Sequence, residues 1–307
     1  MTKAALLTDL PDEFLAFDEP VLAGLDVGAA GKVGLLKLRL VNFDGVTRVQ
    51  RQYQQAPLHA FRPIHLDPSR PDMAFIFVQQ SGDGFVQGDR HRVDVECGPG
   101  ASAHVTTQAA TKVFAARQNF ATQLVNLDVA AGAVLEYLPD PVVPCRGSRF
   151  FQRVTATVDP DATVILGETL LPGRVAHGEA NAYDAYWSET EVRRPDGRLL
   201  FADVLRLNPA HGTPATSIGT SGARDVVASL HVITSRIDPG GLVLALRGAL
   251  ALCADIVVGT SELPNDCGAV VRMLGRSSKT VQAAVTTAWN AARMALLGAP
   301  APDLRKG

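Results

Sequence analysis

Cysteine is scarce in this sequence. Its 307 residues include only four cysteines, which lie far apart and form no Cys-x-x-Cys pair. A structural zinc site needs paired ligands a few residues apart, and a disulfide framework needs a denser set of cysteines. The sequence therefore predicts reduced thiols, as in a cytoplasmic protein, and no structural zinc site.

The sequence also has little excess charge, with 29 basic and 31 acidic residues and a formal net charge of −2. Nucleic-acid-binding proteins usually carry a basic patch or stripe, so the composition gives no support for that function. The most hydrophobic stretch, residues 241–258, contains Arg247 and Asp255, which makes it a poor membrane span. The N-terminal residues lack the basic start and the unbroken apolar run of a secretory signal. We expect a soluble protein that does not bind membranes.

Regular strand signals occupy most of the chain. Residues 33–57 alternate apolar and polar positions around the turn Asp44-Gly45, which predicts a β-hairpin. From residue 34 to residue 208, strand pairs across short Gly, Asp or Pro turns return about every 25 to 30 residues, with no helix among them. This pattern predicts a mainly β body, either a sandwich or a β-helix-like stack of strand pairs.

The C-terminal third has a different pattern. Residues 240–252 predict a short buried helix between strands, and residues 277–298 predict a longer one. One face of the longer helix follows the i, i+4, i+7 spacing and consists of Val281, Val285, Ala288, Ala292 and Leu296. Gly298 would end it, and Pro300 would prevent its continuation. Two helices on a β body define an α+β fold in which β structure dominates.

The predicted organisation is one domain after a short leader. Residues 1–30 are rich in Ala, Gly, Asp and Pro and predict a weakly structured leader. Residues 31–307 predict a single β-rich domain. Within it, a strand stack would occupy 34–208, and further strands with the two helices would occupy 209–307.

The segment Ser81–Arg92 concentrates glycine and charge. Its glycines, at positions 82, 84 and 88, permit backbone angles that other residues resist, as in a phosphate-binding loop. The Lys-Ser or Lys-Thr of such a loop is missing, and strands flank the segment where a helix should follow. Asp89 and His91 are two residues apart in a predicted strand, so they could face one side and share a metal ion. A tight turn with solvated charges is the alternative.

A second cluster lies between residues 167 and 180. Glu168, His177 and Glu179 are possible ligands for a divalent ion such as nickel or zinc. A charged surface loop is the alternative. The two glutamates could instead act as an acid–base pair if the fold brought them together, as in a carbohydrate-active hydrolase or lyase on a β-solenoid.

The stretch TTQAATKVF, residues 106–114, places hydroxyls, an amide and alanines in a segment that otherwise resembles a strand. Small polar side chains of this kind are typical of the wall of a narrow wet space. Tight backbone packing is the alternative reading of the same pattern.

Four motifs resemble those of a known family in their order and spacing. They are SGDGFVQGD (81–89), TTQAATKVF (106–114), LEYLPDPVVP (135–144) and LLPGRVAHGE (170–179). In them the chain is similar to the urease accessory proteins called UreD, or UreH in some bacteria. The C-terminal part fits as well, with RMLGRSS followed by Trp289, Arg293 and Gly298.

The resemblance implies a β-rich, helix-like stack of strands and a scaffold role in urease maturation, without catalysis. Proteins of this family bind urease apoprotein and recruit UreF, and through UreF they recruit the GTPase UreG, which brings nickel. A water-filled passage through the UreD body is thought to guide the nickel. No tightly bound cofactor is implied, only transient Ni²⁺.

The matching motif positions imply which residues form that passage. Asp89, Asp140 and Glu179 are the main candidates, and Glu168 and His177 are weaker ones. A conduit for a hydrated cation needs oxygen ligands that exchange readily with water. Such oxygens could come from Thr106, Thr107, Gln108 and Thr111. A plain β-rich protein-binding module without metal transfer is the remaining alternative.

Overall fold

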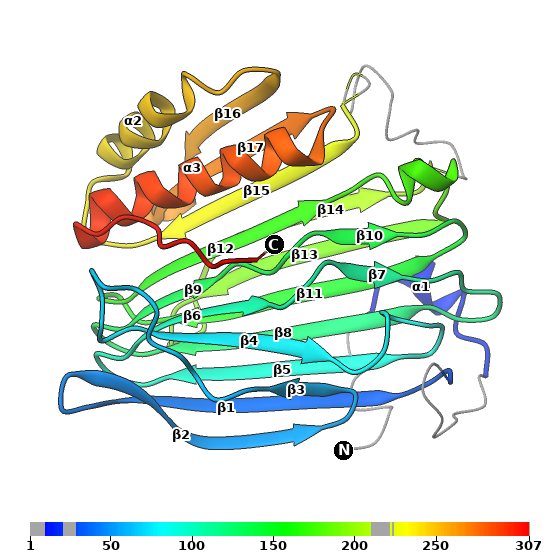
Figure 1. Cartoon of the computed structure of the whole chain (residues 1–307), viewed down its shortest axis with the longest axis horizontal. Helices are drawn as coiled ribbons and strands as arrows, with labels where there is room; N and C mark the ends of the chain where they lie inside the picture. The colour runs from blue at the N-terminus through cyan, green and yellow to red at the C-terminus, as the bar shows by residue number, and fades with distance from the viewer. Residues whose placement is uncertain (1–9, 21–28, 210–221, 223, 307) are drawn as a thin grey trace.

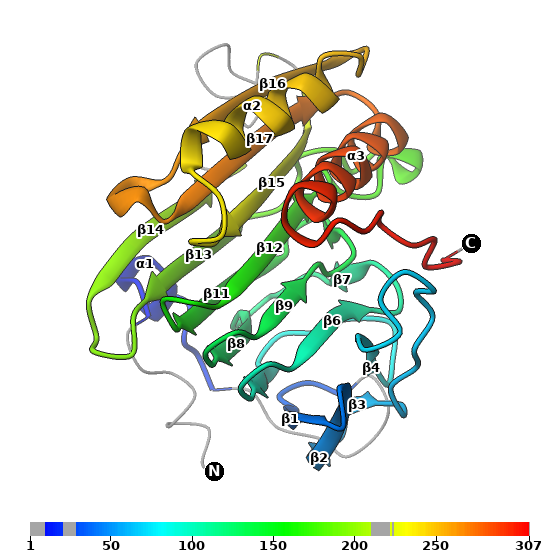
Figure 2. The same ribbon diagram turned by 90° about the vertical axis from the view of Figure 1, so that its left-hand side faces the viewer.

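The computed structural model describes residues 10–20, 29–209, 222 and 224–306. Two large β-sheets lie face to face, and two helices cover the outer face of one of them (Figures 1 and 2). The first, sheet A, has the order β14-β13-β11-β8-β5-β1-β2, with bounds β1 Val33–Phe43, β2 Val46–Gln55, β5 Arg90–Cys97, β8 Ala121–Val129, β11 Arg149–Val158, β13 Ala185–Arg193 and β14 Leu199–Leu207.

The second sheet, sheet B, has ten strands. Its main path follows the order β16-β17-β15-β12-β9-β6-β4-β3, and the short strands β7 and β10 pair beside it. The bounds are β3 Leu58–Ala60, β4 Ala74–Gln80, β6 Ser102–Thr107, β7 Thr111–Val113, β9 Val134–Tyr137, β10 Val142–Pro144, β12 Thr163–Leu170, β15 Val226–Ile233, β16 Ile256–Glu262 and β17 Gly268–Gly275.

The central strands form a β-solenoid. The chain passes from one sheet to the other at successive turns, so that β5, β8, β11 and β13 are parallel neighbours in sheet A. Strands β4, β6, β9 and β12 are parallel neighbours in sheet B. The prediction of a mainly β, β-helix-like strand stack is confirmed.

The predicted local strand pairing is wrong for most of the stack. The hairpin at Asp44-Gly45 forms, because β1 and β2 pair antiparallel, and β13 pairs with β14 in the same way. Strands β5 and β6, however, are joined by the turn at residues 98–101 and lie in different sheets. Gly and Pro turns serve a hairpin and a turn between sheets equally well, so the local sequence does not distinguish them.

Two helices cover sheet B. Helix α2 (Pro239–Leu250) begins at Asp238, whose side chain accepts a hydrogen bond from the backbone N–H of Gly241 at 3.0 Å. Helix α3 (Ser278–Leu297) buries its predicted face against β15 and β17, and it ends at Gly298 with a φ of 62°. Short 3₁₀ turns occupy η2 (Val175–His177) and η4 (Pro264–Asp266). None of the helices in the described part of the chain has the length and apolar character that crossing a membrane requires.

A buried charged cluster fixes α3 to sheet B. The guanidinium of Arg293 is fully buried and donates to the carboxylates of Asp67 and Glu136. Glu136 also contacts Nδ1 of His104 at 2.7 Å. A buried guanidinium is tolerated only when it is paired and hydrogen-bonded, so these contacts determine where the helix sits.

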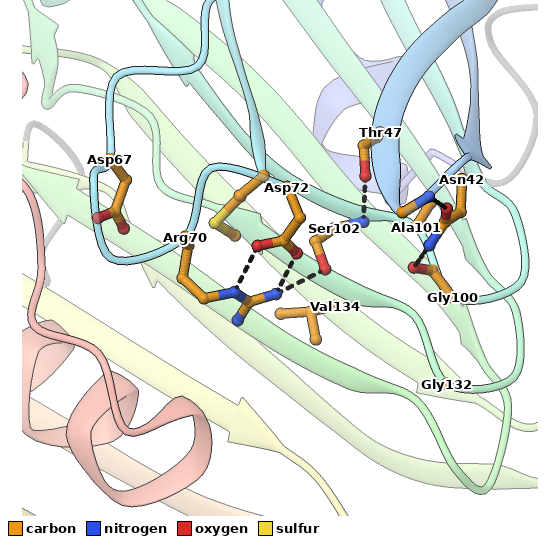
Figure 3. Close-up of polar contacts among 12 residues, drawn as sticks. Asn42, Thr47, Asp67, Arg70, Asp72, Gly100, Ala101, Ser102, Gly132 and Val134 are labelled. Atoms are coloured by element: carbon orange, nitrogen blue, oxygen red, sulfur yellow. Dashed lines mark hydrogen bonds and ion pairs between the residues drawn. The ribbon is translucent and has the colours of Figure 1, made fainter.

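The loop before β4 is tied to the strand stack at one end of the molecule (Figure 3). Arg70 donates from Nε to Asp72 at 2.8 Å and from Nη2 to the hydroxyl of Ser102 at 3.0 Å. The backbone N–H of Ser102 donates to Oγ1 of Thr47 at 2.7 Å. This network joins β2, β6 and the loop through polar contacts.

Part of the expected leader packs on the outer face of sheet A. Helix α1 (Asp12–Leu15) buries Phe14, whose ring centroid lies 5.2 Å from that of Phe120 and 5.7 Å from that of Phe151. Residues 1–9 and 21–28 of the expected leader lie outside the described residues. The domain boundaries stay predictions.

Candidate functional site

The space between the two sheets has an apolar half, called the dry half here, and a half lined by polar side chains, called the wet half. In the dry half, in-register strands of sheet A present Val95, Leu127, Ala156 and Val192 to the inside. Four residues back along the same strands, the corresponding positions are His91, Gln123, Gln152 and Ser188. Side chains two or four residues apart in a strand share a face, so these polar groups also point inward.

A hydrogen-bond network occupies the middle of the wet half. Nε2 of Gln152 lies 3.0 Å from Oε1 of Glu168, 3.0 Å from the hydroxyl of Tyr186 and 2.9 Å from the hydroxyl of Ser188. The Tyr186 hydroxyl donates to the same Glu168 oxygen at 2.6 Å. Burial raises the pKa of Tyr186 well above its usual value, so the phenol stays protonated and donates. Oε1 of Glu168 thus accepts hydrogen bonds from two uncharged side chains, those of Gln152 and Tyr186.

Cavities continue through this polar region. A mouth cavity of about 460 Å³ lies beside the Gly82–Gly84 loop and is lined by Thr107, Gln108 and Thr111 among others. An inner cavity of about 30 Å³ shares three lining residues with it, Thr111, Gln123 and Tyr137. Both Asp140 and Glu168 line the inner cavity.

The inner cavity adjoins a far cavity. This space of about 10 Å³ shares Glu168 and Thr190 with the inner cavity, and Asp203 and Arg272 line it as well. One water molecule needs roughly 10–15 Å³, so the inner cavity has room for about two waters and the far cavity for about one. The three cavities form a series that is wide at the mouth and narrow inside.

At the far cavity, the carboxylate of Asp203 contacts the side chains of His231 and Arg272. Its Oδ2 lies 3.0 Å from Nε2 of His231, and its Oδ1 accepts from Arg272 at 2.6 Å. The hydrogen bond with His231 is the largest cause, and together with Arg272 it lowers the pKa of Asp203 to about 2 despite partial burial. The carboxylate is therefore charged at neutral pH.

Asp89 lies near the mouth but not in the series. Its two oxygens accept from the backbone N–H groups of Lys32 and Val86 at 2.9 and 3.0 Å, and burial raises its pKa. It lines a side cavity of about 420 Å³ behind the same Gly82–Gly84 loop. The nitrogens of His91 have no hydrogen-bond partner among the described residues, so no hydrogen bond links His91 to Asp89.

Glu179 and His177 lie together in an outer loop. Arg174 donates to both oxygens of Glu179 at 2.8 and 2.6 Å, and the backbone N–H of Arg146 adds a bond of 3.2 Å. The Arg174 contact is the main cause that lowers the pKa of Glu179 to about 2. His177 is exposed in the η2 turn. Neither residue lines the three cavities, so the fold does not bring Glu179 to Glu168.

Thr106 points to the other side of sheet B. It is fully buried, and its hydroxyl donates to the carbonyl of Leu138 at 2.6 Å. Its neighbour Thr107 faces the cavities and donates to Oδ2 of Asp140 at 3.1 Å. Of the four expected lining residues, the structure brings Thr107, Gln108 and Thr111 to the mouth cavity.

The described residues contain no group of three or more His, Cys, Asp or Glu side chains arranged to hold a metal ion. The carboxylates Asp140 and Glu168 line one small space together with amides and hydroxyls. Oxygen groups of this kind are the ligands that hard divalent cations prefer.

Sequence reasoning missed the polar side chains of sheet A and β15. Gln123 and Gln152 line the inner cavity, as do Thr190 and His231. A signal for the glutamines was present, since each occupies the apolar phase of its strand. Gln123 precedes Val125 and Leu127 at alternate positions, and Gln152 precedes Val154 and Ala156. A polar residue at the start of an inward-facing apolar set marks a local break in the core.

The known proteins that are similar to this chain share one description, that of a UreD urease accessory protein. The profile of the family described as UreD urease accessory protein matches residues 32–306. The urease accessory protein UreD 2 of Streptomyces griseus is 43% identical over 280 residues, which cover 91% of this chain and 95% of that protein. The UreD of Haloarcula marismortui is 36% identical over 280 residues (91% and 92%), and UreD 2 of Brucella suis is 32% identical over 288 residues (93% and 94%).

The fold is a β-solenoid with a series of polar cavities between its sheets, and the known proteins that align with most of the chain are accessory proteins. The matches make the class specific, and the chain belongs to the UreD family of urease accessory proteins. Members of this family are maturation factors rather than enzymes. The alternative of a carbohydrate-active hydrolase or lyase that pairs Glu168 with Glu179 is therefore wrong.

Proposed function

We propose that this protein is a scaffold that binds urease apoprotein and UreF-like and UreG-like accessory proteins, and passes Ni²⁺ to the urease active site. Family membership supports the role in urease maturation. The series of three cavities supports the passage of an ion through the body. We place this function in the cytoplasm, which the four free cysteines favour.

One observation carries the proposal: Asp140 and Glu168, remote in sequence, line the same inner cavity. The cavity has room for only about two waters, so a hydrated Ni²⁺ must exchange part of its water shell for protein oxygens there. Two carboxylates, with the amides of Gln123 and Gln152 beside them, supply those oxygens. The set is too small to trap the ion, which a conduit requires.

The remaining predicted residues take supporting roles in this proposal. Thr107, Gln108 and Thr111 provide exchangeable oxygens at the wide mouth. Asp89 holds the strand that borders the mouth by accepting two backbone N–H groups. Glu179 fixes the outer loop through Arg174. We assign transient contact with the ion to Asp140 and Glu168.

The test is urease activation with matched variants. Asp140→Asn and Glu168→Gln keep the size of each side chain and remove its charge. Glu189→Gln is the control, since Glu189 bonds Arg153 and Trp187 away from the cavities. Each variant is co-produced with urease and the UreF-like and UreG-like partners. Nickel per urease active site and the amount of co-purified partner are then measured.

We expect Asp140→Asn and Glu168→Gln to lower nickel loading about tenfold or more while the complex still co-purifies, and Glu189→Gln to behave as the parent. Normal loading by both cavity variants would instead favour a plain binding module. Failure of the parent chain to co-purify with urease or a UreF-like protein would refute the scaffold itself.

A further inference from the structure

The segment after α3 crosses the outer face of sheet B. These residues, 299–306, are called the strap here; Figure 1 shows them in red, running back below α3 to the marked C-terminus. The backbone N–H of Ala301 donates to the side chain of Asn290 in α3 at 2.9 Å. Leu304 packs both on the cluster under α3 and on the Met73 and Phe75 cluster. The strap is thus docked on α3 and on sheet B.

Lys306 ends the described part of the strap with its ammonium directed into sheet B. Its Nζ donates to Oγ1 of Thr106 at 2.7 Å and to Oδ2 of Asp140 at 2.9 Å, and it lies 5.8 Å from the ring centroid of Phe77. The lysine and aspartate side chains are each 22% exposed. The ion pair is therefore largely shielded, and it is stronger than a pair in open solvent.

Asp140 connects the strap with the cavity series. Its Oδ2 accepts from Lys306 and also from Thr107, whose side chain lines the mouth cavity. Asp140 itself lines the inner cavity. Asp140 therefore contacts the strap through its carboxylate and also borders the cavity series.

We propose that Lys306 is a tethered competitor of the cation in the passage. While the strap is docked, its ammonium neutralises Asp140 and weakens the hold of the inner cavity on a divalent cation. When the strap lifts, Asp140 regains its full charge for the cation. This inference rests on the proposed function and adds its regulation: the hold on the ion is set by a segment outside the cavity.

The coupling must act in both directions. If the docked strap weakens cation binding by some factor, a bound cation must weaken docking of the strap by the same factor. Two independent measurements therefore test the same coupling factor between docking of the strap and binding of the cation. The first is the affinity of the full chain for Ni²⁺, and the second is the protection of amide hydrogens in residues 301–306 from exchange.

The central variant is Lys306→Met, which shortens the unbranched side chain by one atom and removes its charge. We expect Ni²⁺ to bind about tenfold more tightly, because one cation no longer sits against the carboxylate. We also expect faster amide exchange in the strap without metal. In the parent chain, added Ni²⁺ should speed exchange in the strap, whereas in Lys306→Met it should change little.

Three controls isolate the contact. Lys306→Arg retains a cation and should keep the affinity within about twofold of the parent. Arg305→Met removes the neighbouring charge, which is exposed and makes no contact with Asp140, and should also leave the affinity unchanged. In the double variant Lys306→Met with Asp140→Asn, the gain in affinity should disappear.

Unchanged Ni²⁺ affinity in Lys306→Met, or an equal gain in Arg305→Met, would overturn the competitor role. The outcome is separable from that of the proposed function. Normal urease loading by Asp140→Asn and Glu168→Gln, together with tighter binding by Lys306→Met, would refute the passage and leave the competition at Asp140 standing. Reduced urease loading by those two variants, together with unchanged Ni²⁺ affinity in Lys306→Met, would support the passage and refute the competition at Asp140.

Discussion

The dry and wet halves of the interior differ although the same strands build them. On β8, Leu127 and Gln123 share the inward face four residues apart, and on β11, Ala156 and Gln152 do the same. Leu127 and Ala156 belong to one buried apolar cluster, whereas the two glutamines line the inner cavity. One backbone thus carries a core at one end and a polar space at the other.

The difference teaches how a solenoid can contain a hydrated interior and remain folded. Burying a leucine or valine side chain contributes about 1.5–3 kcal/mol, and the dry half repeats such burial on every strand. In the wet half, Gln152 hydrogen-bonds Glu168, Tyr186 and Ser188, whereas the buried ring nitrogens of His91 have no partner among the described residues. Hydrogen-bonded polar groups add little net stability but avoid the cost of unpaired burial. The dry half therefore contributes most of the stability, and the proposed passage is assigned to the wet half.

The sharpest way to break this contrast is to place a wet-half residue in the dry half. Leu127→Gln removes a fully buried side chain and leaves an amide without partners. We expect a loss of about 4 kcal/mol in the free energy of unfolding, the sum of lost apolar burial and an unsatisfied polar group. Urea unfolding followed by circular dichroism measures it. Leu127→Met is the control and should cost less than about 1.5 kcal/mol; similar losses for both variants would contradict the contrast.

A medium effect is expected at the far end of the wet half. The depressed pKa of Asp203, about 2 against the ordinary 3.8, makes its charged form stabilise the folded state. That stability is present above the unfolded pKa and is lost as pH falls through the folded pKa. Asp203→Asn should therefore lower the free energy of unfolding by about 2 kcal/mol at pH 7.

The pH dependence is the diagnostic part of that prediction. The difference in the free energy of unfolding between the parent and Asp203→Asn should begin to narrow near pH 4 and nearly vanish by about pH 2. Urea unfolding at pH 7, 4 and 3 follows the trend. A difference that stays constant over this range would mean that packing, rather than the charge held by His231 and Arg272, accounts for the loss.

Periodicity within one segment was enough to predict the strands, the strand stack and helix α3. Val281, Ala288 and Ala292 are buried as their spacing predicts. The partner of each strand was not predictable in this way. Residues Gln123 and Gln152 meet across neighbouring strands because parallel strands of a solenoid repeat at a distance that no local pattern encodes. The expectation of hairpins failed within the central stack for the same reason, although β1 pairs with β2 and β13 with β14 as predicted.

The candidate site was predicted only where a motif and an inward face coincided. Asp140 and Glu168 line the inner cavity, while Glu179, equally acidic and in the same kind of motif, bonds Arg174 in an outer loop. Composition cannot separate these carboxylates, since the difference is which face of the backbone each occupies. The contact of Lys306 with Asp140 spans 166 residues and has no local signal at all.

The smallest effect on stability, and the most direct test of function, comes from extending the dry half into the wet one. Gln123 lines both the mouth and the inner cavities, and its side chain hydrogen-bonds Tyr137. In Gln123→Leu, the lost hydrogen bond and the gained apolar burial should nearly cancel, within about 1 kcal/mol.

Nickel loading of urease should nevertheless fall, because an apolar side chain would then stand where the two cavities meet and would offer an ion no oxygen in exchange for its water. The exposed Gln118→Leu is the matched control and should load nickel as the parent does. Unfolding curves together with nickel per urease active site give both quantities. Full loading by a stable Gln123→Leu protein would show that ions do not cross this junction, and the wet half would then need another explanation.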